Sequence, residues 1–348
     1  MFFASDNTSG VHPRILDALV RANDGYPPSY GDDAIMARVR DRLRETFEAP
    51  EAAVYLVATG TAANSLILGT LAQPYETIFC TPMSHINEDE ANAPEFYTGG
   101  AKLTLTGTED AKMSAATLRK AIEAEGTRGV HGPKRGPVSL TNVTERGTVY
   151  DLDELGRIGT VAKEFGLPLH LDGARFGNAV EALGCTAAEM SWKAGVDAVS
   201  FGGTKSGCMG VEAVVFFDPA RAEEFEFRRK RGGHLFSKHR YLSAQMAAYL
   251  EDDLWRSLAA QANAACQRLA QALKQMPDVR FSHDTPANII FASWPRGLHE
   301  KLKAAGAHYH LYSGSETGPE DEMQEARLVT SWSTSEEDVD RFLEVMRH

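Results

Sequence analysis

The sequence has few cysteines and no excess of positive charge. Its 348 residues include four cysteines, with no CxxC pair and no metal-ligand spacing. Scattered cysteines of this kind predict reduced thiols in a cytoplasmic protein rather than a disulfide framework. The formal net charge is -12. Because nucleic acids and anionic membranes attract an excess of Lys and Arg, this balance argues against both partners, although a local basic spot can still hold one phosphate.

Long apolar runs are also missing. The opening segment MFFASDNTSG has no basic stretch and its apolar part ends at Ala4, so we expect no secretory signal. The longest apolar-leaning stretch, residues 54–71, contains Thr59, Asn64 and Ser65, which argues against a membrane span. We therefore expect a soluble, cytoplasmic protein.

Short apolar runs alternate with amphipathic segments along most of the chain. In residues 151–166 the apolar side chains recur every three or four positions, which is typical of one helix face. Asp151 occupies the expected N-cap, with Glu154 three residues later, and Gly166 suits the end. Alternation of this kind predicts a mostly parallel sheet covered by helices on both faces. The runs expected to form buried strands are 54–57, 77–80, 138–141, 167–171, 198–201 and 211–217.

The length of the chain predicts two domains of unequal size. Residues 1–50 lack strand signals, and we expect them to pack on the large domain and on a partner subunit. The large domain is expected at 51–240. Residues 241–348 would then form a connector helix and a small C-terminal α+β domain, because the pattern is almost wholly helical to about residue 275. The segment GPKRGP at 132–137 reads as a solvated loop.

Two predicted strand ends carry the strongest chemical signal. Lys205 follows one apolar run within SFGGTKSG, where glycines let the backbone approach a bulky ligand. A partly desolvated lysine has a lowered pKa and is a nucleophile towards an aldehyde. Asp172, in HLDGAR, ends another predicted strand. The pair suits a pyridine ring whose nitrogen stays protonated against Asp172 while an aldehyde carbon bonds to Lys205. Arg175, three residues after Asp172, could reach the ring phenolate of such a cofactor or a substrate carboxylate. The alternatives are an exposed loop lysine and an N-cap aspartate paired with Arg175.

Two further segments fit the same kind of ligand. In TGTAANS, residues 59–65, a strand ends and a helix begins, so backbone N–H groups and threonine hydroxyls make a site for a phosphate dianion. His85 follows another predicted strand, where an imidazole can stack on a pyridinium and accept a proton from a substrate hydroxyl. A plain capped helix and a surface histidine are the alternatives.

Taken together and in this order, these segments resemble the threonine aldolase family. This family lies in the β-eliminating-lyase branch of the fold-type-I pyridoxal-phosphate enzymes, and the sequence looks most like low-specificity bacterial L-threonine or phenylserine aldolases. The similarity spans nearly the whole chain. The matching segments are FASDNTSG at the start, YGDD at 30–33, TGTAANS at 59–65, Ser-His at 84–85, APEF at 93–96, GTVY at 147–150, HLDGARF at 170–176, SWKAGVD at 191–197 and SFGGTKSG at 200–207.

The resemblance implies a fold, a cofactor and a set of roles. The implied fold is an aspartate-aminotransferase-like (fold type I) large domain with a mostly parallel seven-stranded sheet, plus the small domain. Pyridoxal 5'-phosphate would form a Schiff base with Lys205, with Asp172 on its ring nitrogen and His85 stacked on the ring. The other implied positions are Gly60 and Thr61 for the phosphate, Arg175 and Arg327 with Ser5 for the substrate carboxylate, His131 near the substrate's β-substituent, Tyr30 as a contribution from the partner subunit, and Lys230 as the partner's phosphate contact.

The implied reaction is cleavage of L-threonine, L-allo-threonine or a related β-hydroxy-α-amino acid to glycine and an aldehyde. His85, or a water held by His85 and His131, would take the β-hydroxyl proton. Other reactions on the same scaffold stay open, namely β-elimination, transamination and serine hydroxymethyl transfer, and so does a non-catalytic cofactor-binding role. A homodimer or homotetramer with shared active sites is expected. Whether the enzyme prefers substrates with a methyl or an aryl group on the β-carbon is left open.

Overall fold

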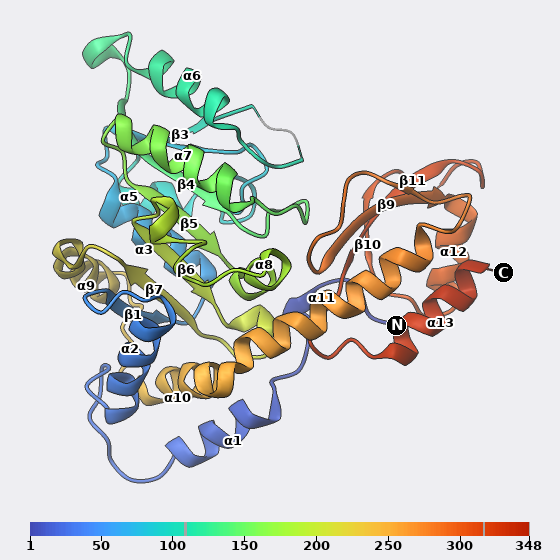
Figure 1. Cartoon of the computed structure of the whole chain (residues 1–348), viewed down its shortest axis with the longest axis horizontal. Helices are drawn as coiled ribbons and strands as arrows, with labels where there is room; N and C mark the ends of the chain where they lie inside the picture. Colours follow the sequence, from blue (N-terminus) through green and yellow to red (C-terminus); the bar gives the residue numbers. More distant parts are fainter. Residues whose placement is uncertain (108–109, 316, 348) are drawn as a thin grey trace.

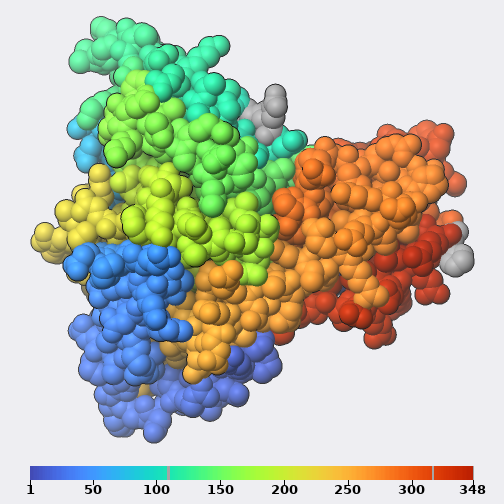
Figure 2. Space-filling view, in the orientation of Figure 1, coloured from blue at the N-terminus to red at the C-terminus, as the bar shows by residue number. Residues whose placement is uncertain are grey.

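The chain folds into a large domain and a small domain, each built on its own β-sheet. The structure is a computed structural model that describes residues 1–107, 110–315 and 317–347. The large domain contains a seven-stranded sheet and the small domain a four-stranded sheet. Helix α11 (Leu254–Leu273) runs from one domain to the other (Figure 1). In Figure 2 the small domain, in orange and red, projects from one side of the large domain. The predicted fold class is confirmed.

The large sheet has the strand order β1-β7-β6-β5-β4-β2-β3. Strand β7 is antiparallel to both of its neighbours, and the other pairs are parallel. Each of the six apolar runs overlaps one of its strands. The short edge strand β3 was not predicted, because its four residues are only partly buried. The strands are β1 (Ala53–Val57), β2 (Glu76–Cys80), β3 (Lys102–Leu105), β4 (Lys134–Thr141), β5 (Leu169–Gly173), β6 (Ala198–Gly202) and β7 (Glu212–Phe216).

Helices cover both faces of this sheet, because successive strand residues point to opposite sides. In β1, Val54 and Leu56 belong to the main core, whereas Tyr55 and Val57 pack with residues of α3 and α9. The main core also includes residues from α2, α6, α7, α8 and α10. The helices of this part are α1 (Pro13–Ala22), α2 (Ala34–Thr46), α3 (Gly60–Leu71), α4 (His85–Glu88), α5 (Ala93–Thr98), α6 (Ala115–Glu125), α7 (Leu152–Glu164), α8 (Phe176–Leu183), α9 (Ala222–Arg231) and α10 (Arg240–Leu250).

Short 3-10 helices fill several connections of the chain. They are η1 (Asp6–Thr8), η2 (Gly129–His131), η3 (Trp192–Ala194), η4 (Thr204–Ser206), η5 (Pro219–Arg221) and η6 (Glu251–Asp253). Helix η4 follows β6 directly and contains Lys205, and η1 lies near the start of the chain.

The predicted capping of α7 is present. The side chain of Asp151 accepts a hydrogen bond from the backbone N–H of Glu154, and the side chain of Glu154 accepts one from the backbone N–H of Asp151. Gly166, just beyond the helix, has φ +66, a conformation that favours glycine.

The loop expected at 132–137 is instead mostly strand. Strand β4 begins at Lys134, which pairs with Glu76 of β2. A Cβ on Gly136 would lie 2.7 Å from the carbonyl oxygen of Thr77, so the glycine permits close approach of the two strands. The turn-like composition of the segment therefore reflects packing within the sheet.

The small domain is an antiparallel sheet with helices on it. The strand order is β10-β11-β9-β8. The chain start also contacts this domain, because the backbone N–H of Phe3 donates to His308 and the N–H of Val329 donates to Phe3. The elements are β8 (Arg280–Phe281), β9 (Ile289–Pro295), α12 (Arg296–Ala304), β10 (His310–Ser313), β11 (Met323–Val329) and α13 (Glu336–Arg347). Within the described ranges, no helix combines the length and apolar character needed to cross a bilayer.

Two glycines in α7 provide a matched test of this packing. A Cβ on Gly159 would lie 2.1 Å from the carbonyl oxygen of Ala194, whereas one on Gly156 would meet nothing within 4 Å. We expect Gly159→Ala to lower the free energy of unfolding by about 1–3 kcal/mol through overpacking. Gly156→Ala should raise it by about 0.5–1 kcal/mol, because alanine loses less backbone entropy in a helix. Urea unfolding measures both, and changes of the same sign would contradict this account.

Candidate functional site

A cavity lies at the edge of the large sheet where the parallel strands β4, β5 and β6 end. Ligands of open parallel sheets bind beyond the carboxyl ends of the strands. The cavity has a volume of about 260 Å³, close to the lower end of the roughly 300–1,000 Å³ typical of small-molecule sites. Its lining residues are Asn7, Ala58, Thr59, Gly60, Thr61, Asn64, His85, Thr141, Val143, Glu145, Asp172, Ala174, Arg175, Thr204, Lys205 and Glu212.

Asp172 and Lys205 line this same cavity. Asp172 lies near the end of β5, in register with Ser200 of the parallel neighbour β6. Lys205 follows five residues after Ser200, in η4. The carboxylate and the amine therefore emerge from adjacent strand ends into one space, as the sequence predicted.

The carboxylate of Asp172 is oriented by two hydrogen bonds. The side-chain amide of Asn64 donates to one oxygen at 2.8 Å, and the backbone N–H of Ala174 donates to the other at 2.9 Å. The same Asn64 amide donates to Glu90 at 2.9 Å, and its carbonyl oxygen accepts from Ser200 at 2.9 Å. Asn64 thus lies between the buried carboxylates of Asp172 and Glu90 and fixes the orientation of both.

The environment of Lys205 makes its ammonium group easier to deprotonate. Burial lowers the pKa of Lys205, and the positive charge of Arg175 lowers it further. No hydrogen bond engages its Nζ in the described part of the chain. A lowered pKa makes the free amine, which is the nucleophile towards an aldehyde, easier to form.

The N-terminus of α3 forms another part of the cavity wall. Thr59 caps the helix, with its hydroxyl accepting from the N–H of Ala62 at 3.1 Å. Gly60 and Thr61 occupy the first turn and line the cavity. Free N–H groups at a helix start attract a phosphate. Sequence analysis predicted this arrangement.

His85 is the first residue of α4 and is held at both its ring and its backbone. Its Nδ1 lies 2.7 Å from Glu90, and its backbone N–H donates to Glu145 at 2.9 Å. The hydrogen bond with Glu90 raises the pKa of His85. Its side chain remains 35% exposed, so the ring is anchored and still accessible to a ligand.

The two predicted arginines differ in their partners. Arg175 lines the cavity, and two of its nitrogens donate to Asp6 at 2.6 and 2.9 Å. Asn288 of the small domain also donates to Asp6, at 3.1 Å. The guanidinium of Arg327, in β11, makes no hydrogen bond or ion pair with any described residue, although the backbone of Arg327 pairs with both neighbouring strands. Burial lowers the pKa of Arg327 to about 10, and Arg175 adds to this effect.

Five predicted positions, Arg327 among them, do not line the cavity within one chain. His131 ends η2, before β4 begins, whereas the site lies at the other end of β4, roughly 25 Å along the strand. Within one chain His131 and the cavity therefore lie at opposite ends of β4, and its place near the substrate stays a prediction. Ser5 instead caps η1. Lys230 lies 4.6 Å from the centre of the Tyr30 ring, away from the cavity lining.

Several site residues were missed by sequence analysis. Asn64 lies inside TGTAANS, but its bridging role depends on residues far away in the sequence. Glu90 and Glu145 carried no motif signal, because their partners are brought to them by the fold. Glu212 begins β7, and one of its oxygens accepts from the N–H of Gly203 at 2.8 Å. Burial raises the pKa of Glu212 to about 7.

The donor set of the cavity fits pyridoxal phosphate. Asp172 is an oriented carboxylate for a ring nitrogen, and Lys205 is an unpartnered amine for an aldehyde. The first turn of α3 offers N–H groups for a phosphate. In the described ranges, no cluster of His, Cys, Asp and Glu is arranged to bind a metal.

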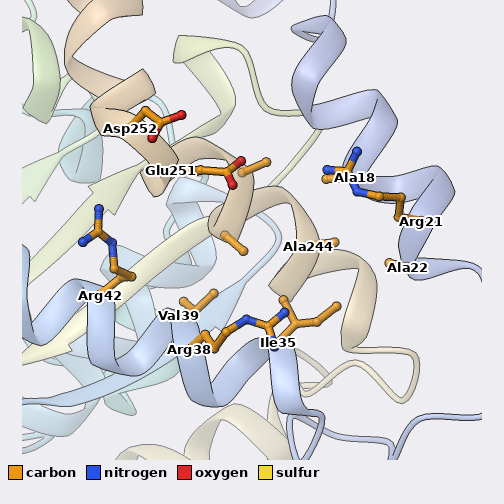
Figure 3. A pocket seen from close by; sticks show the side chains of 12 residues that line it. Ala18, Arg21, Ala22, Ile35, Arg38, Val39, Arg42, Ala244, Glu251 and Asp252 are labelled. Atoms are coloured by element: carbon orange, nitrogen blue, oxygen red, sulfur yellow. The ribbon is translucent and has the colours of Figure 1, made fainter.

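A second cavity, of about 600 Å³, lies between α1, α2 and α10 (Figure 3). Its wall contains alanines together with Arg21, Arg38 and Arg42. None of the predicted site residues lines it. It carries no carboxylate and lysine pair of the kind that a pyridine ring requires.

The chain is similar to known proteins over most of its length. The family model of the β-eliminating lyases matches residues 3–294. A low specificity L-threonine aldolase of Pseudomonas aeruginosa is 42% identical, covering 99% of this chain and 96% of that protein. A protein of the same description from a Pseudomonas species is 41% identical, covering 96% and 93%. The solved structure of a Leishmania major threonine aldolase matches with a TM-score of 0.93 at 28% identity, covering 99% and 98%.

Glu212 provides a test of the electrostatics of the cavity. Because burial raises its pKa from 4.5 to about 7, the folded protein holds this proton more tightly than the unfolded chain. Its contribution to stability is present below pH 4.5 and is lost as the pH rises through 7. In cofactor-free protein, the unfolding free energy of wild type relative to Glu212→Gln should fall by about 3 kcal/mol between pH 4.5 and 8. If urea titrations show that the unfolding free energies of wild type and Glu212→Gln change with pH in the same way, this account is wrong.

Proposed function

The chain belongs to the β-eliminating lyase family, and on that basis we propose that it is a pyridoxal-phosphate-dependent aldolase. Its substrates are L-threonine, L-allo-threonine and related β-hydroxy-α-amino acids, which it cleaves to glycine and an aldehyde. The observation that carries this proposal is the shared cavity of Asp172 and Lys205. The similarity to low specificity L-threonine aldolases favours the aldol cleavage over β-elimination or serine hydroxymethyl transfer on the same scaffold.

The proposed cofactor contacts follow from the donor set. Lys205 would hold the cofactor covalently, Asp172 would bind its ring nitrogen, and His85 would stack on its ring. Gly60 and Thr61 would bind its phosphate. When bound, the cofactor supplies an electron sink for the electron pair of the bond that breaks.

We propose that Arg327 is the principal group that binds the substrate carboxylate. An unpaired, buried guanidinium gains a strong hydrogen-bond partner when a carboxylate arrives. Arg175 lies close enough to shift the pKa of Arg327 and has a terminal nitrogen that Asp6 does not engage. Together the two arginines would orient the amino acid, and orientation is a large contribution to rate in such reactions.

His85 is the proposed proton acceptor for the β-hydroxyl group. Its accessible ring is held by Glu90, so that its second nitrogen faces away from that contact. Neutral His85 accepts the hydroxyl proton while the Cα–Cβ bond breaks and the hydroxyl oxygen becomes the aldehyde oxygen. Protonation of Cα then yields glycine.

A homo-oligomer with shared sites is part of the proposal. Gly60 and Thr61 have only Arg175 and Lys205 as cationic neighbours in the lining of their own cavity. A further cation for the phosphate would come from Lys230 of a second copy of the chain, and Tyr30 of that copy would lie beside it. Residues 1–50 would form part of the contact between the two copies. We also expect a cytoplasmic protein, because its four cysteines are buried free thiols. The proposed domain division is an N-terminal segment at 1–50, a large domain at 51–240, and a connector helix with the small domain at 241–348.

A substrate panel tests the reaction type. Purified protein is incubated with L-threonine, L-allo-threonine and phenylserine, with and without added pyridoxal phosphate. We expect stoichiometric glycine and aldehyde, dependent on the cofactor and abolished in Lys205→Ala. A keto acid and ammonia as the main products would instead identify an eliminase.

A pair of variants tests the role of His85. We expect His85→Ala to lower the cleavage rate by roughly 10²–10⁴-fold, with a much smaller change in cofactor affinity. In Glu90→Gln the hydrogen bond that raises the pKa of His85 is weakened, so neutral His85 forms at lower pH. The rise of kcat/KM with pH should therefore move to lower pH. Near-normal turnover of His85→Ala, or an unmoved profile in Glu90→Gln, would rule out this role.

A further inference from the structure

A tight turn between β4 and α7 reaches from the large domain to the small domain. The backbone N–H of Thr144 donates to Thr148, and the N–H of Gly147 donates to Thr144, both at 2.9 Å. Two adjacent residues of this turn, Glu145 and Arg146, have partners in different domains. Glu145 faces the cofactor cavity. Arg146 contacts the small domain.

Arg146 touches three strands of the small sheet. Two of its nitrogens donate to the carboxylate of Glu325, in β11, at 3.0 and 3.2 Å. Its guanidinium lies 4.0 Å from the ring centre of Phe291, in β9, and 4.6 Å from that of Tyr312, in β10. The side chains of Arg146 and Glu325 are only 14% and 13% exposed. A bidentate pair between two aromatic rings has a defined geometry, unlike a mobile surface ion pair.

Gly147 brings the backbones of the two domains together at the same point. Its φ is +79, a conformation that favours glycine. A Cβ at this position would lie 2.8 Å from Cβ of Ile289 and 2.9 Å from its carbonyl oxygen. The turn is therefore in direct contact with the start of β9.

The partner of Arg146 lies two residues from the proposed carboxylate-binding arginine. Alternate residues of a strand share a face, so Glu325 and Arg327 lie on the same side of β11. Gln324, Ala326 and Leu328, between and beside them, are buried on the other side. An ion pair at Glu325 thus fixes the part of the strand that carries Arg327.

The other residue of the turn is tied to the proposed base. One oxygen of Glu145 accepts from the backbone N–H of His85 at 2.9 Å and from the hydroxyl of Thr141 at 2.8 Å. Consecutive residues therefore contact the backbone of His85 and the strand that carries Arg327. The turn connects the two proposed substrate contacts across the domain boundary.

We propose that Arg146 and Glu325 form an interdomain ion pair that positions Arg327 relative to His85. This inference rests on the proposed function of those two residues. A substrate spans the carboxylate and the β-hydroxyl, so both contacts form together only at one separation of the domains. If the ion pair already holds the two domains at that separation, substrate binding does not have to supply the free energy needed to order them. Arg146 is a positioning residue and contacts no substrate.

The test is a charge exchange with a matched control. The variants are Arg146→Glu, Glu325→Arg and the double exchange, prepared with bound pyridoxal phosphate. The dissociation constant of glycine is measured from the change in the visible absorbance of the cofactor. We expect each single variant to weaken glycine binding and to raise KM for L-threonine by about tenfold, with unchanged cofactor affinity, and the double exchange to recover most of the loss.

The control pair is Arg256 and Glu181, a more exposed ion pair between α11 and α8. Arg256→Glu should leave glycine binding unchanged, because this pair does not contact β11. If Arg146→Glu does not fold, Arg146→Gln takes its place in the comparison. In the cofactor-free protein, hydrogen exchange of β11 should be faster in the Arg146 variant than in wild type.

The outcomes separate this inference from the proposed function. If Arg327→Ala leaves glycine affinity unchanged, the proposed role of Arg327 is wrong. If Arg327→Ala weakens glycine binding but the Arg146 and Glu325 variants do not, only the positioning role fails. Failure of the double exchange to recover affinity, or equal hydrogen exchange of β11 in variant and wild type, also overturns the positioning role.

Discussion

The parallel pairing of β5 and β6 is the constraint on which the rest of the site depends. Their register sets Asp172 opposite Ser200, so the chain leaves both strands at the same edge of the sheet. Lys205 then needs only a short 3-10 turn to reach the same cavity as Asp172. A slip of one residue would turn the carboxylate to the opposite face of the sheet.

Burial determines the chemical state of almost every group around that pair. Glu145 and Glu212 are enclosed, and burial raises the pKa of each to about 7. Burial instead lowers the pKa of Lys205. Asn64 resolves the remaining conflict, because its neutral amide donates to Glu90 and Asp172 at once. Glu145 and Glu212 therefore keep their protons to higher pH than an exposed carboxyl group does.

The sequence allowed the strands and the Asp172–Lys205 pair to be predicted because their signals are local. Each residue directly follows an apolar run, and the order of such runs predicts a parallel sheet. Contacts such as that of Asn64 with Asp172, 108 residues apart, depend on folding and have no local pattern. His131 illustrates the same limit. The family resemblance, and no local pattern, placed it near the substrate; within one chain it precedes β4, at the opposite edge of the sheet from the Asp172–Lys205 cavity.

The hydrogen-bond partners of the cationic groups distinguish their tasks. Arg175 is engaged by Asp6, which Asn288 of the small domain also contacts, so this arginine joins three parts of the chain. Arg327 and Lys205 are partly buried, and within the described ranges neither side chain has a hydrogen-bond partner. An unpaired buried cation costs free energy, which the surrounding packing must offset. That cost is recovered when a ligand brings an anion to the arginine and an aldehyde to the lysine. Within the described ranges, these two side chains without partners are therefore the groups best suited to bind the substrate and the cofactor.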